Sequence, residues 1–288
     1  MIASHASGHF NAWHAQVKLE YTRIADKTWL SRREHDGPLY VQKSLYPEAQ
    51  DVCHTVILHP PSGIVSGDVL EIQLHLKDRS HVLLTTPGAN KWYSAKKTEP
   101  NRAAQSLQCE LDSGAVLEWL PQENIIYNGA CGTLSSTINL HEGAQFIGWE
   151  ILCLGRRASG EIFTRGQINL LGRLSRNNQL MWLERGVLQG GGPLLNAEIG
   201  LAGMSVCATF VATLPASGAP ATLIEACRAV KPAEPHAYYG LSVLPGVLVV
   251  RYLGHFAESA RGWFSTLWEI LRPPLLGKAA TLPRIWRT

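Results

Sequence analysis

The chain has 288 residues, of which 45% are hydrophobic and 17% charged, so it is long enough to bury a sizeable core. Its 26 lysines and arginines against 23 aspartates and glutamates give a net charge of +3, too even a balance to indicate a nucleic-acid or membrane partner. We expect no signal peptide, because no basic region followed by an apolar run opens the sequence. Six scattered cysteines without a CxxC pair favour a reduced, cytoplasmic setting.

Short apolar runs separated by Gly, Pro, Asn or Asp turns dominate the sequence and predict β-strands. In chain order the expected strands cover residues 13–24, 27–33, 39–43, 52–59, 69–76, 81–86, 106–111, 115–120, 133–140, 145–153, 161–170, 180–187, 204–214 and 246–253. The predicted fold class is therefore all-β in the sense of mainly β with a few helices. Periodicity alone leaves open whether the strands form a sandwich, a barrel or a solenoid.

Helical periodicity is confined to two segments, residues 221–230 and 255–271. In the second segment Trp263, Phe264 and Trp268 form an aromatic stripe, which favours packing on the chain's own core over a docking surface. Pro273 is expected to stop this helix. No Ser/Gly linker divides the sequence, so we expect one domain over residues 1–288, with residues 1–12 flexible.

Nucleotide binding and acyl-transfer catalysis are both disfavoured. The glycine-containing loop at residues 59–68 ends in Asp68, where a phosphate-binding loop needs a lysine. Ser159 lacks the preceding glycine of a nucleophile elbow and is flanked by predicted strands. We therefore expect neither a nucleotide site nor a serine acyl-transfer site in this chain.

A tight metal site is not predicted either. Cys53 and His59 lie on one extended run, roughly 20 Å apart at the rise of a strand, and cannot share an ion. His75 and His81 flank a predicted turn, and simple hairpin pairing would place them on opposite faces. No dense His or Cys constellation exists in the sequence, so no metal is expected to be tightly bound.

Carboxylates interrupt several otherwise apolar strands, at Glu118, Glu150 and Glu184. An unpaired charge among such neighbours is costly to bury. Either these side chains face solvent or meet an arginine such as Arg156, Arg157 or Arg185, or they line a hydrated path for a weakly held divalent cation.

Six sequence segments, in order, resemble the UreD/UreH family of urease accessory proteins, over a span from about Trp29 to Thr288. They are residues 37–47 (GPLYVQKSLYP), 53–68 (CHTVILHPPSGIVSGD), 85–93 (TTPGANKWY), 118–126 (EWLPQENII), 149–161 (WEILCLGRRASGE) and 272–288 (RPPLLGKAATLPRIWRT). Ser62 and Ser66 depart from the pattern, since the family usually has glycine there. If those positions need a positive φ, each serine costs on the order of 1 kcal/mol.

The resemblance implies an elongated, β-helix-like stack of strands that is not an enzyme and acts as a scaffold in nickel insertion into apo-urease. The implied partners are apo-urease, the accessory protein UreF and, through UreF, the GTPase UreG, in a paired hetero-oligomer. Nickel would be in transit through a polar passage rather than a resident cofactor. The residues that the family match assigns to the passage or its supporting shell are Asp68, Glu118, Glu123, Glu150, Arg156 and Glu161. Those it assigns to structure are Gly63, Gly67, Thr85, Thr86, Lys91, Tyr93, Trp119, Pro121, Gly155 and Gly160.

Two alternatives from other functional classes remain at this point. The chain could be a metallochaperone with its own tight nickel site. Less favoured is a glycan-processing enzyme on a β-helix, which would need a groove of exposed acids and aromatics.

Overall fold

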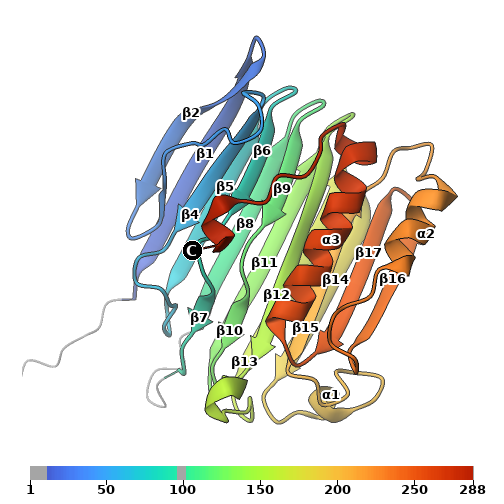
Figure 1. Cartoon of the computed structure of the whole chain (residues 1–288). Helices are drawn as coiled ribbons and strands as arrows, with labels where there is room; N and C mark the ends of the chain where they lie inside the picture. Colours follow the sequence, from blue (N-terminus) through green and yellow to red (C-terminus); the bar gives the residue numbers. More distant parts are fainter. Residues whose placement is uncertain (1–11, 96–101, 288) are drawn as a thin grey trace, which may run out of the picture.

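The computed structural model describes residues 12–95 and 102–287 and is built mainly from β-strands (Figure 1). This confirms the predicted class of mainly β with a few helices. Of the expected flexible stretch at residues 1–12, all but Ala12 lies outside the described residues, as does Thr288 of the family's ending.

Two mixed sheets contain the described strands. The seven-stranded sheet runs in the order β14 (Gln179–Gln189), β13 (Gln167–Arg176), β11 (Cys131–Leu140), β8 (Ala103–Leu111), β5 (Val69–Leu76), β1 (His14–Ile24) and β2 (Lys27–Asp36). The ten-stranded sheet runs in the order β16 (Tyr238–Leu244), β17 (Val247–Gly254), β15 (Val206–Thr213), β12 (Gln145–Leu154), β9 (Val116–Leu120), β6 (His81–Thr85), β4 (Val52–Leu58) and β3 (Tyr40–Val41), with β10 (Asn124–Ile126) and β7 (Asn90–Trp92) beside this path.

Between β4 and β13 the longer strands alternate between the two sheets, and each pairs in parallel with the preceding strand of its own sheet. Parallel pairing needs a crossover between the partners, and here the crossover passes through the other sheet. His75 on β5 and His81 on β6 therefore belong to different sheets, so the predicted hairpin between them is wrong.

The described helices are α1 (Pro193–Asn196), α2 (Ala221–Ala229) and α3 (Ala257–Leu276), and Figure 1 shows α3 packed on the ten-stranded sheet alongside β12. Two short 3₁₀ turns cover Arg157–Ser159 and Arg284–Arg287. None of the described helices is long and apolar enough to cross a membrane.

The core has two layers. The first lies between the sheets, where inward side chains such as Val17, Leu74 and Leu117 alternate with outward polar ones along each strand. The second lies between the ten-stranded sheet and α3, where Trp263, Phe264 and Trp268 are all buried. The aromatic stripe of α3 thus packs on the chain's own core.

Helix α3 extends beyond its predicted end. Pro273 and Pro274 lie inside its last turn, and the helix ends at Gly277, whose φ of 68° is left-handed. Proline is disfavoured inside a helix because it lacks an N–H and its ring crowds the preceding turn. Here the buried side chain of Leu275 holds the last turn against the core, so packing overrides the local preference.

Other elements also differ from the sequence prediction. Strand β13 begins at Gln167 instead of residue 161, because residues 157–166 form a 3₁₀ turn and a loop. Strand β16 was not predicted, since it is an exposed edge whose residues show no clear alternation of apolar and polar side chains. The short strands β7 and β10 were also missed, because they have three residues each.

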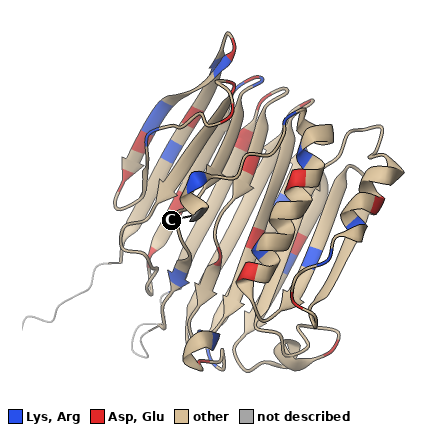
Figure 2. Ribbon diagram, viewed as in Figure 1, with Lys and Arg blue, Asp and Glu red and all other residues tan. Residues whose placement is uncertain are grey.

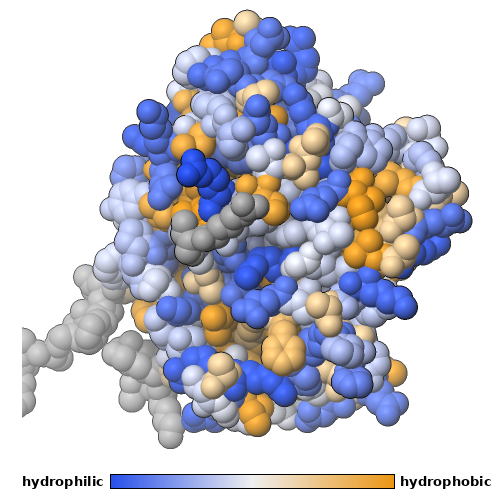
Figure 3. All heavy atoms as spheres, viewed as in Figure 1, coloured by the Kyte–Doolittle hydropathy of each residue, from blue (hydrophilic) through white to orange (hydrophobic). Residues whose placement is uncertain are grey.

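Charged residues of both signs are spread over the molecule, including positions within strands (Figure 2). On the face that carries α3, hydrophobic groups are interrupted by hydrophilic ones (Figure 3). All six cysteines are free thiols.

Candidate functional site

Glu150 on β12 is an acidic side chain that faces the space between the sheets. Its strand neighbours Trp149 and Ile151 pack in the layer under α3. Because successive side chains of a strand point to opposite faces, Glu150 is turned toward the seven-stranded sheet.

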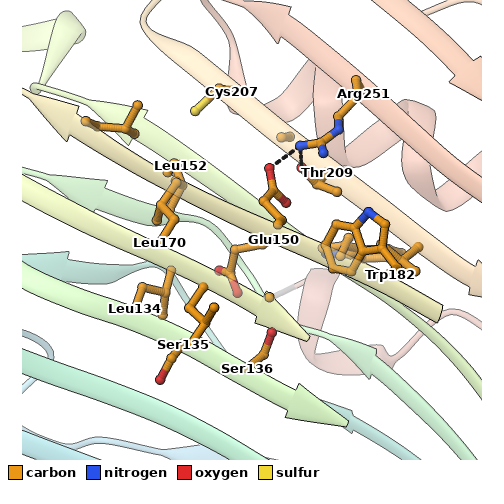
Figure 4. Close-up of a pocket in the computed structure, with 18 of the residues that line it drawn as sticks. Leu134, Ser135, Ser136, Glu150, Leu152, Leu170, Trp182, Cys207, Thr209 and Arg251 are labelled. Atoms are coloured by element: carbon orange, nitrogen blue, oxygen red, sulfur yellow. Dashed lines mark hydrogen bonds and ion pairs between the residues drawn. The ribbon is translucent and has the colours of Figure 1, made fainter. Parts of the chain in front are cut away.

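Two cavities meet at Glu150. The larger, of about 520 Å³, lies between the sheets near β13 and β14, and Figure 4 shows Ser136, Thr209 and Arg251 among its polar side chains. The smaller, of about 150 Å³, lies near the loop at residues 86–90. Glu150 and Trp119 line both, so the carboxylate lies at the junction of the two hollow spaces.

A row of amide side chains holds Glu150 on the side of the smaller cavity. Asn124 Nδ2 donates to Glu150 Oε1 at 2.5 Å, and Asn124 Oδ1 accepts from Trp92 Nε1 at 2.9 Å. Asn90 Nδ2 lies 3.2 Å from the same Asn124 oxygen and 2.7 Å from Gln105 Oε1. The row joins β12, β10, β7 and β8 without a formal positive charge.

These surroundings make Glu150 an unusually weak acid. Burial raises its pKa, the hydrogen bond from Asn124 lowers it, and the charge of Glu184 raises it, with a net pKa of about 8. At neutral pH the group is therefore largely protonated, and a cation that binds to it must displace a proton.

The larger cavity has an ion pair that joins the two sheets. Glu184 on β14 pairs with Arg251 on β17, and Arg251 Nη1 also donates to Thr209 Oγ1 at 2.7 Å (Figure 4). Cys207 lines the same cavity, and burial raises the pKa of its thiol to about 12, so it stays protonated at neutral pH.

Glu118 lies on the opposite face of the ten-stranded sheet from this space, under α3. It is fully buried, and Arg272 Nε and Nη2 donate to its two oxygens at 2.9 and 3.0 Å. His81 Nε2 and Trp268 Nε1 lie 2.6 and 2.5 Å from the same carboxylate. Burial alone would raise the pKa of Glu118, but the hydrogen bond and charge of His81 and the charge of Arg272 outweigh it, and the net pKa is about 2.

Arg272 also binds a second carboxylate, Glu48, at 2.8 and 2.9 Å, and Glu48 lies 2.7 Å from His54 Nε2. Together Glu48, His54, His81, Glu118 and Arg272 form a closed network of buried charged and imidazole side chains. Every oxygen of its two carboxylates has a partner, so the network fastens α3 to the sheet and leaves no free ligand for a passing cation.

The remaining acids predicted for the passage are also engaged with protein groups. Asp68 accepts backbone hydrogen bonds at 2.9 Å from both Trp13 and Val65, which fixes the turn before β5. Glu123 pairs with Arg261 of α3 at 2.7 Å. Of the six residues predicted for the passage, the structure places only Glu150 between the two cavities, within the part of the chain that it describes.

Arg156 and Glu161 pair with each other at 2.7 Å at the edge of the fold. The hydrogen bond from Arg156 lowers the pKa of Glu161, and Asn128 N donates to the same carboxylate at 3.0 Å. The pair orders the loop between β12 and β13.

No group of three or more His, Cys, Asp or Glu side chains that could hold a metal ion exists within residues 12–95 and 102–287. The polar groups around the two cavities are carboxylates, hydroxyls and amides, together with the Cys207 thiol, the His59 imidazole and the guanidinium groups of Arg173 and Arg251.

A family model described as "UreD urease accessory protein" matches residues 14–287. The chain belongs to the UreD family of urease accessory proteins. It is 46% identical over 281 residues to the urease accessory protein UreD of Dechloromonas aromatica, covering 97% of this chain and 96% of that protein. It is 47% identical over 276 residues to that of an Azoarcus species (96% and 94%) and 46% identical over 280 residues to that of Pseudomonas aeruginosa (96% and 96%).

Three of the ten residues that the UreD resemblance assigned to structure line the smaller cavity, namely Thr86, Trp119 and Pro121. Thr86 Oγ1 accepts from Gln122 N at 2.9 Å. Thr85 Oγ1 donates to Leu120 O at 2.6 Å, and Pro121 O accepts from Trp149 Nε1 at 2.8 Å. Lys91 O accepts from Ile64 N at 2.7 Å, which joins β7 to the glycine-containing loop.

The glycines of the UreD pattern have distinct roles. A Cβ at Gly63 would lie 2.1 Å from the ring of Tyr93, so this position needs the absence of a side chain. Gly155 has a φ of 81°, and a Cβ there would lie 2.4 Å from Glu161 O, within the Arg156–Glu161 loop. Gly67 and Gly160 also have positive φ, at 88° and 72°.

Of the two serines that replace the usual UreD glycines, Ser62 adopts a left-handed φ of 54°, and Ser66 is absent from the residues with positive φ. The cost on the order of 1 kcal/mol that we expect for a serine with positive φ therefore applies to Ser62 and not to Ser66.

Sequence reasoning missed the neutral part of the site. Asn90, Gln105 and Asn124 are uncharged, so no buried charge marks them as candidate site residues in the sequence. They come into contact only through the pairing and packing of their strands, which periodicity does not predict. Arg272 was also missed as the partner of Glu118, because 154 positions separate the two residues.

Proposed function

We propose that this UreD-family chain is a non-catalytic scaffold in urease maturation and that nickel passes through it toward apo-urease by way of Glu150. The observation that carries the proposal is the position of the Glu150 carboxylate at the junction of two cavities between the sheets. A hydrated divalent cation needs polar atoms along such a route, because an apolar interior would impose a large desolvation cost.

The chemistry of Glu150 suits transit better than storage. Its pKa of about 8 means that nickel competes with a proton, which weakens the bond. Its hydrogen-bond partner Asn124 is neutral, so the group that holds the carboxylate does not itself repel nickel. The hydroxyl oxygen of Ser136 lies along the larger cavity and offers a weak, replaceable contact.

The scaffold role would place the chain in a cytoplasmic complex with apo-urease, UreF and, through UreF, UreG, in paired copies. The relatives' shared name, urease accessory protein UreD, supports a role in urease maturation. The alternation of parallel strands between two sheets supports describing the central part as a β-helix-like stack. Such a stack offers a long internal space and long outer faces at the same time.

A metallochaperone with its own tight nickel site is the competing proposal. Equilibrium dialysis of the isolated chain against Ni²⁺ separates the two. Weak binding that strengthens as pH rises through about 8 supports transit past Glu150, whereas one sub-micromolar site supports the chaperone.

The direct test is the nickel content of urease co-expressed with variants of this chain. Glu150→Leu removes the carboxylate, and we expect at least about tenfold slower filling of urease, which corresponds to a barrier higher by about 1.4 kcal/mol. Glu150→Gln keeps the volume and hydrogen bonding and should give an intermediate loss. The matched control is Glu142→Gln in an exposed turn, which should have no effect.

Each variant should be checked for its melting temperature and for co-purification with urease. Normal nickel content in a folded, complex-forming Glu150→Leu variant would overturn the proposed route. Normal nickel content in a strain that lacks the chain altogether would overturn the scaffold role as well.

A further inference from the structure

Strand β14 ends the seven-stranded sheet, next to the larger cavity. Its ladder partner in the described structure is β13. One edge of β14 therefore presents backbone N–H and C=O groups to solvent, which is a template for pairing with another strand.

The outward face of β13 and β14 alternates leucine and arginine. Leu171 lies opposite Arg185, and Arg173 lies opposite Leu183, so the four form a checkerboard on one surface. Leu171 is 38% exposed and Leu183 51%, and Val187, further along β14, is 49% exposed. The two arginines are exposed as well, and neither has a carboxylate within salt-bridge distance among the described residues.

The neighbouring strand does not neutralise these charges. Ser135 on β11 lies opposite Leu171, and Thr137 lies opposite Arg173. The surface is thus apolar and positively charged, with hydroxyl groups beside it. An apolar area rimmed by unpaired arginines is typical of a protein interface, because arginine forms bidentate pairs with carboxylates.

The opposite edge of the same sheet looks different. On β2, Arg32 pairs with Glu34 at 2.7 Å, and charges of both signs cover the exposed half of the strand. Mixed, self-paired charge is a common protection of an edge strand against association. Strand β14 carries leucine, valine and free arginine in the equivalent place.

We propose that the outward face of β13 and β14, together with the open edge of β14, is a docking surface for an extended acidic segment of a partner protein. Carboxylates of that segment would pair with Arg173 and Arg185, its apolar side chains would cover Leu171 and Leu183, and its backbone would extend the sheet. A second copy of this chain fits poorly, because a symmetric contact would bring arginines toward arginines.

This inference rests on the proposed scaffold role, which supplies the candidate partners. The experiment co-expresses the full chain with apo-urease and the other urease maturation proteins. A photo-crosslinking amino acid is placed at Leu183 and, as a control on the same outer face, at the exposed Gln108 of β8. Mass spectrometry identifies the crosslinked segment.

We expect a crosslink from position 183 to an acidic, extended segment of one co-expressed protein, and none to that segment from position 108. The double variant Arg173→Glu/Arg185→Glu should lower the crosslink yield at least about tenfold, equivalent to a tenfold weaker Kd. Arg173→Lys/Arg185→Lys should retain most of it. The matched control Arg33→Glu, at an exposed position of β2, should retain all of it.

A crosslinked segment without acidic residues, or a yield that the double charge reversal leaves unchanged, overturns the docking surface. Circular dichroism and a melting curve establish that the charge-reversed chain is folded. If urease fills normally without the chain, the scaffold proposal fails together with this one. If filling needs the chain but not the two arginines, only the docking surface fails.

Discussion

Replacing Arg272 with methionine should destabilise the chain by about 3–5 kcal/mol, the usual cost of leaving a buried carboxylate without its partner. The Arg272 side chain is fully buried, and it donates to Glu118 at 2.9 and 3.0 Å and to Glu48 at 2.8 and 2.9 Å. Methionine keeps the apolar contacts of the stem but leaves Glu48 with His54, and Glu118 with His81 and Trp268.

The pKa of Glu118 sets an upper limit on the part of this cost that arises at Glu118, because the shift reflects His81 as well as Arg272. The pKa falls from an ordinary value of 4.5 to about 2, which corresponds to about 3 kcal/mol in favour of the charged form in the folded state. Because the folded pKa is depressed, this stabilisation is present above pH 4.5 and is lost as pH falls toward 2. Arg272→Met should therefore cost much less at about pH 3 than at about pH 7.

Urea denaturation followed by tryptophan fluorescence measures the difference, since the Trp268 ring lies 5.1 Å from the Arg272 guanidinium. The matched control is Arg32→Met, which breaks an exposed pair of 2.7 Å and should cost no more than about 1 kcal/mol. If Arg272→Met cost as little as Arg32→Met, the network would not be the fastening of α3 that its geometry indicates. If Arg272→Met is too unstable to measure, Arg272→Lys is measured instead. We expect Arg272→Lys to lose less stability, because lysine keeps the positive charge.

Three further predictions concern single positions. Between pH 4.5 and 8 the original chain should lose stability, because the pKa of Glu150 is raised in the folded state to about 8, and Glu150→Gln should not. The variant should therefore become more stable relative to the original chain as pH rises over this range. Melting curves across pH would show a constant difference between the two chains if the pKa of Glu150 were ordinary. Gly63→Ala should cost about 1–3 kcal/mol, because its Cβ would lie 2.1 Å from the Tyr93 ring, and a Tyr93→Ala background should remove most of that cost in urea titrations. Ser62→Gly should be neutral or stabilising by up to about 1 kcal/mol, because glycine adopts the φ of 54° without strain. Ser66→Gly should destabilise the chain by a similar amount, because Ser66 has no positive φ to relieve. Equal effects at both positions would contradict the view that the sign of φ decides the outcome.

Alternation of apolar and polar residues predicted most of the strands, because one side of each faces a core. It failed where other forces decide the structure. Residues 161–166 contain the apolar pair Ile162 and Phe163, yet Ile162 is 72% exposed and only Phe163 is buried. The Arg156–Glu161 pair and the turn at Gly160 hold this segment as a loop, and neither leaves a periodic signal.

The sequence pointed to the acidic residues of the candidate site but not to where their side chains lie in the fold. Glu118 and Glu150 both interrupt apolar strands, and sequence alone provides no ground to separate them. The difference lies in which face of the ten-stranded sheet each glutamate occupies. Leu120 is two positions after Glu118 on the same face and packs under α3, whereas Leu152 is two positions after Glu150 on the same face and packs between the sheets. Strand alternation gives each side chain a face but does not say which face meets a helix and which meets the second sheet.

This difference of face gives the two carboxylates opposite electrostatic states. Glu118 has a guanidinium fixed against it, so its charge is neutralised and any added cation would have to displace Arg272. Glu150 has an amide instead, so its burial is offset by a proton that a metal ion can replace. The same residue type thus stabilises the fold on one face of the sheet and, under the proposed function, admits nickel on the other. Giving Glu150 a cationic partner like that of Glu118 tests this directly. Asn124→Arg would place a fixed cation beside Glu150, and nickel filling of urease should fall even though every carboxylate of the chain is retained.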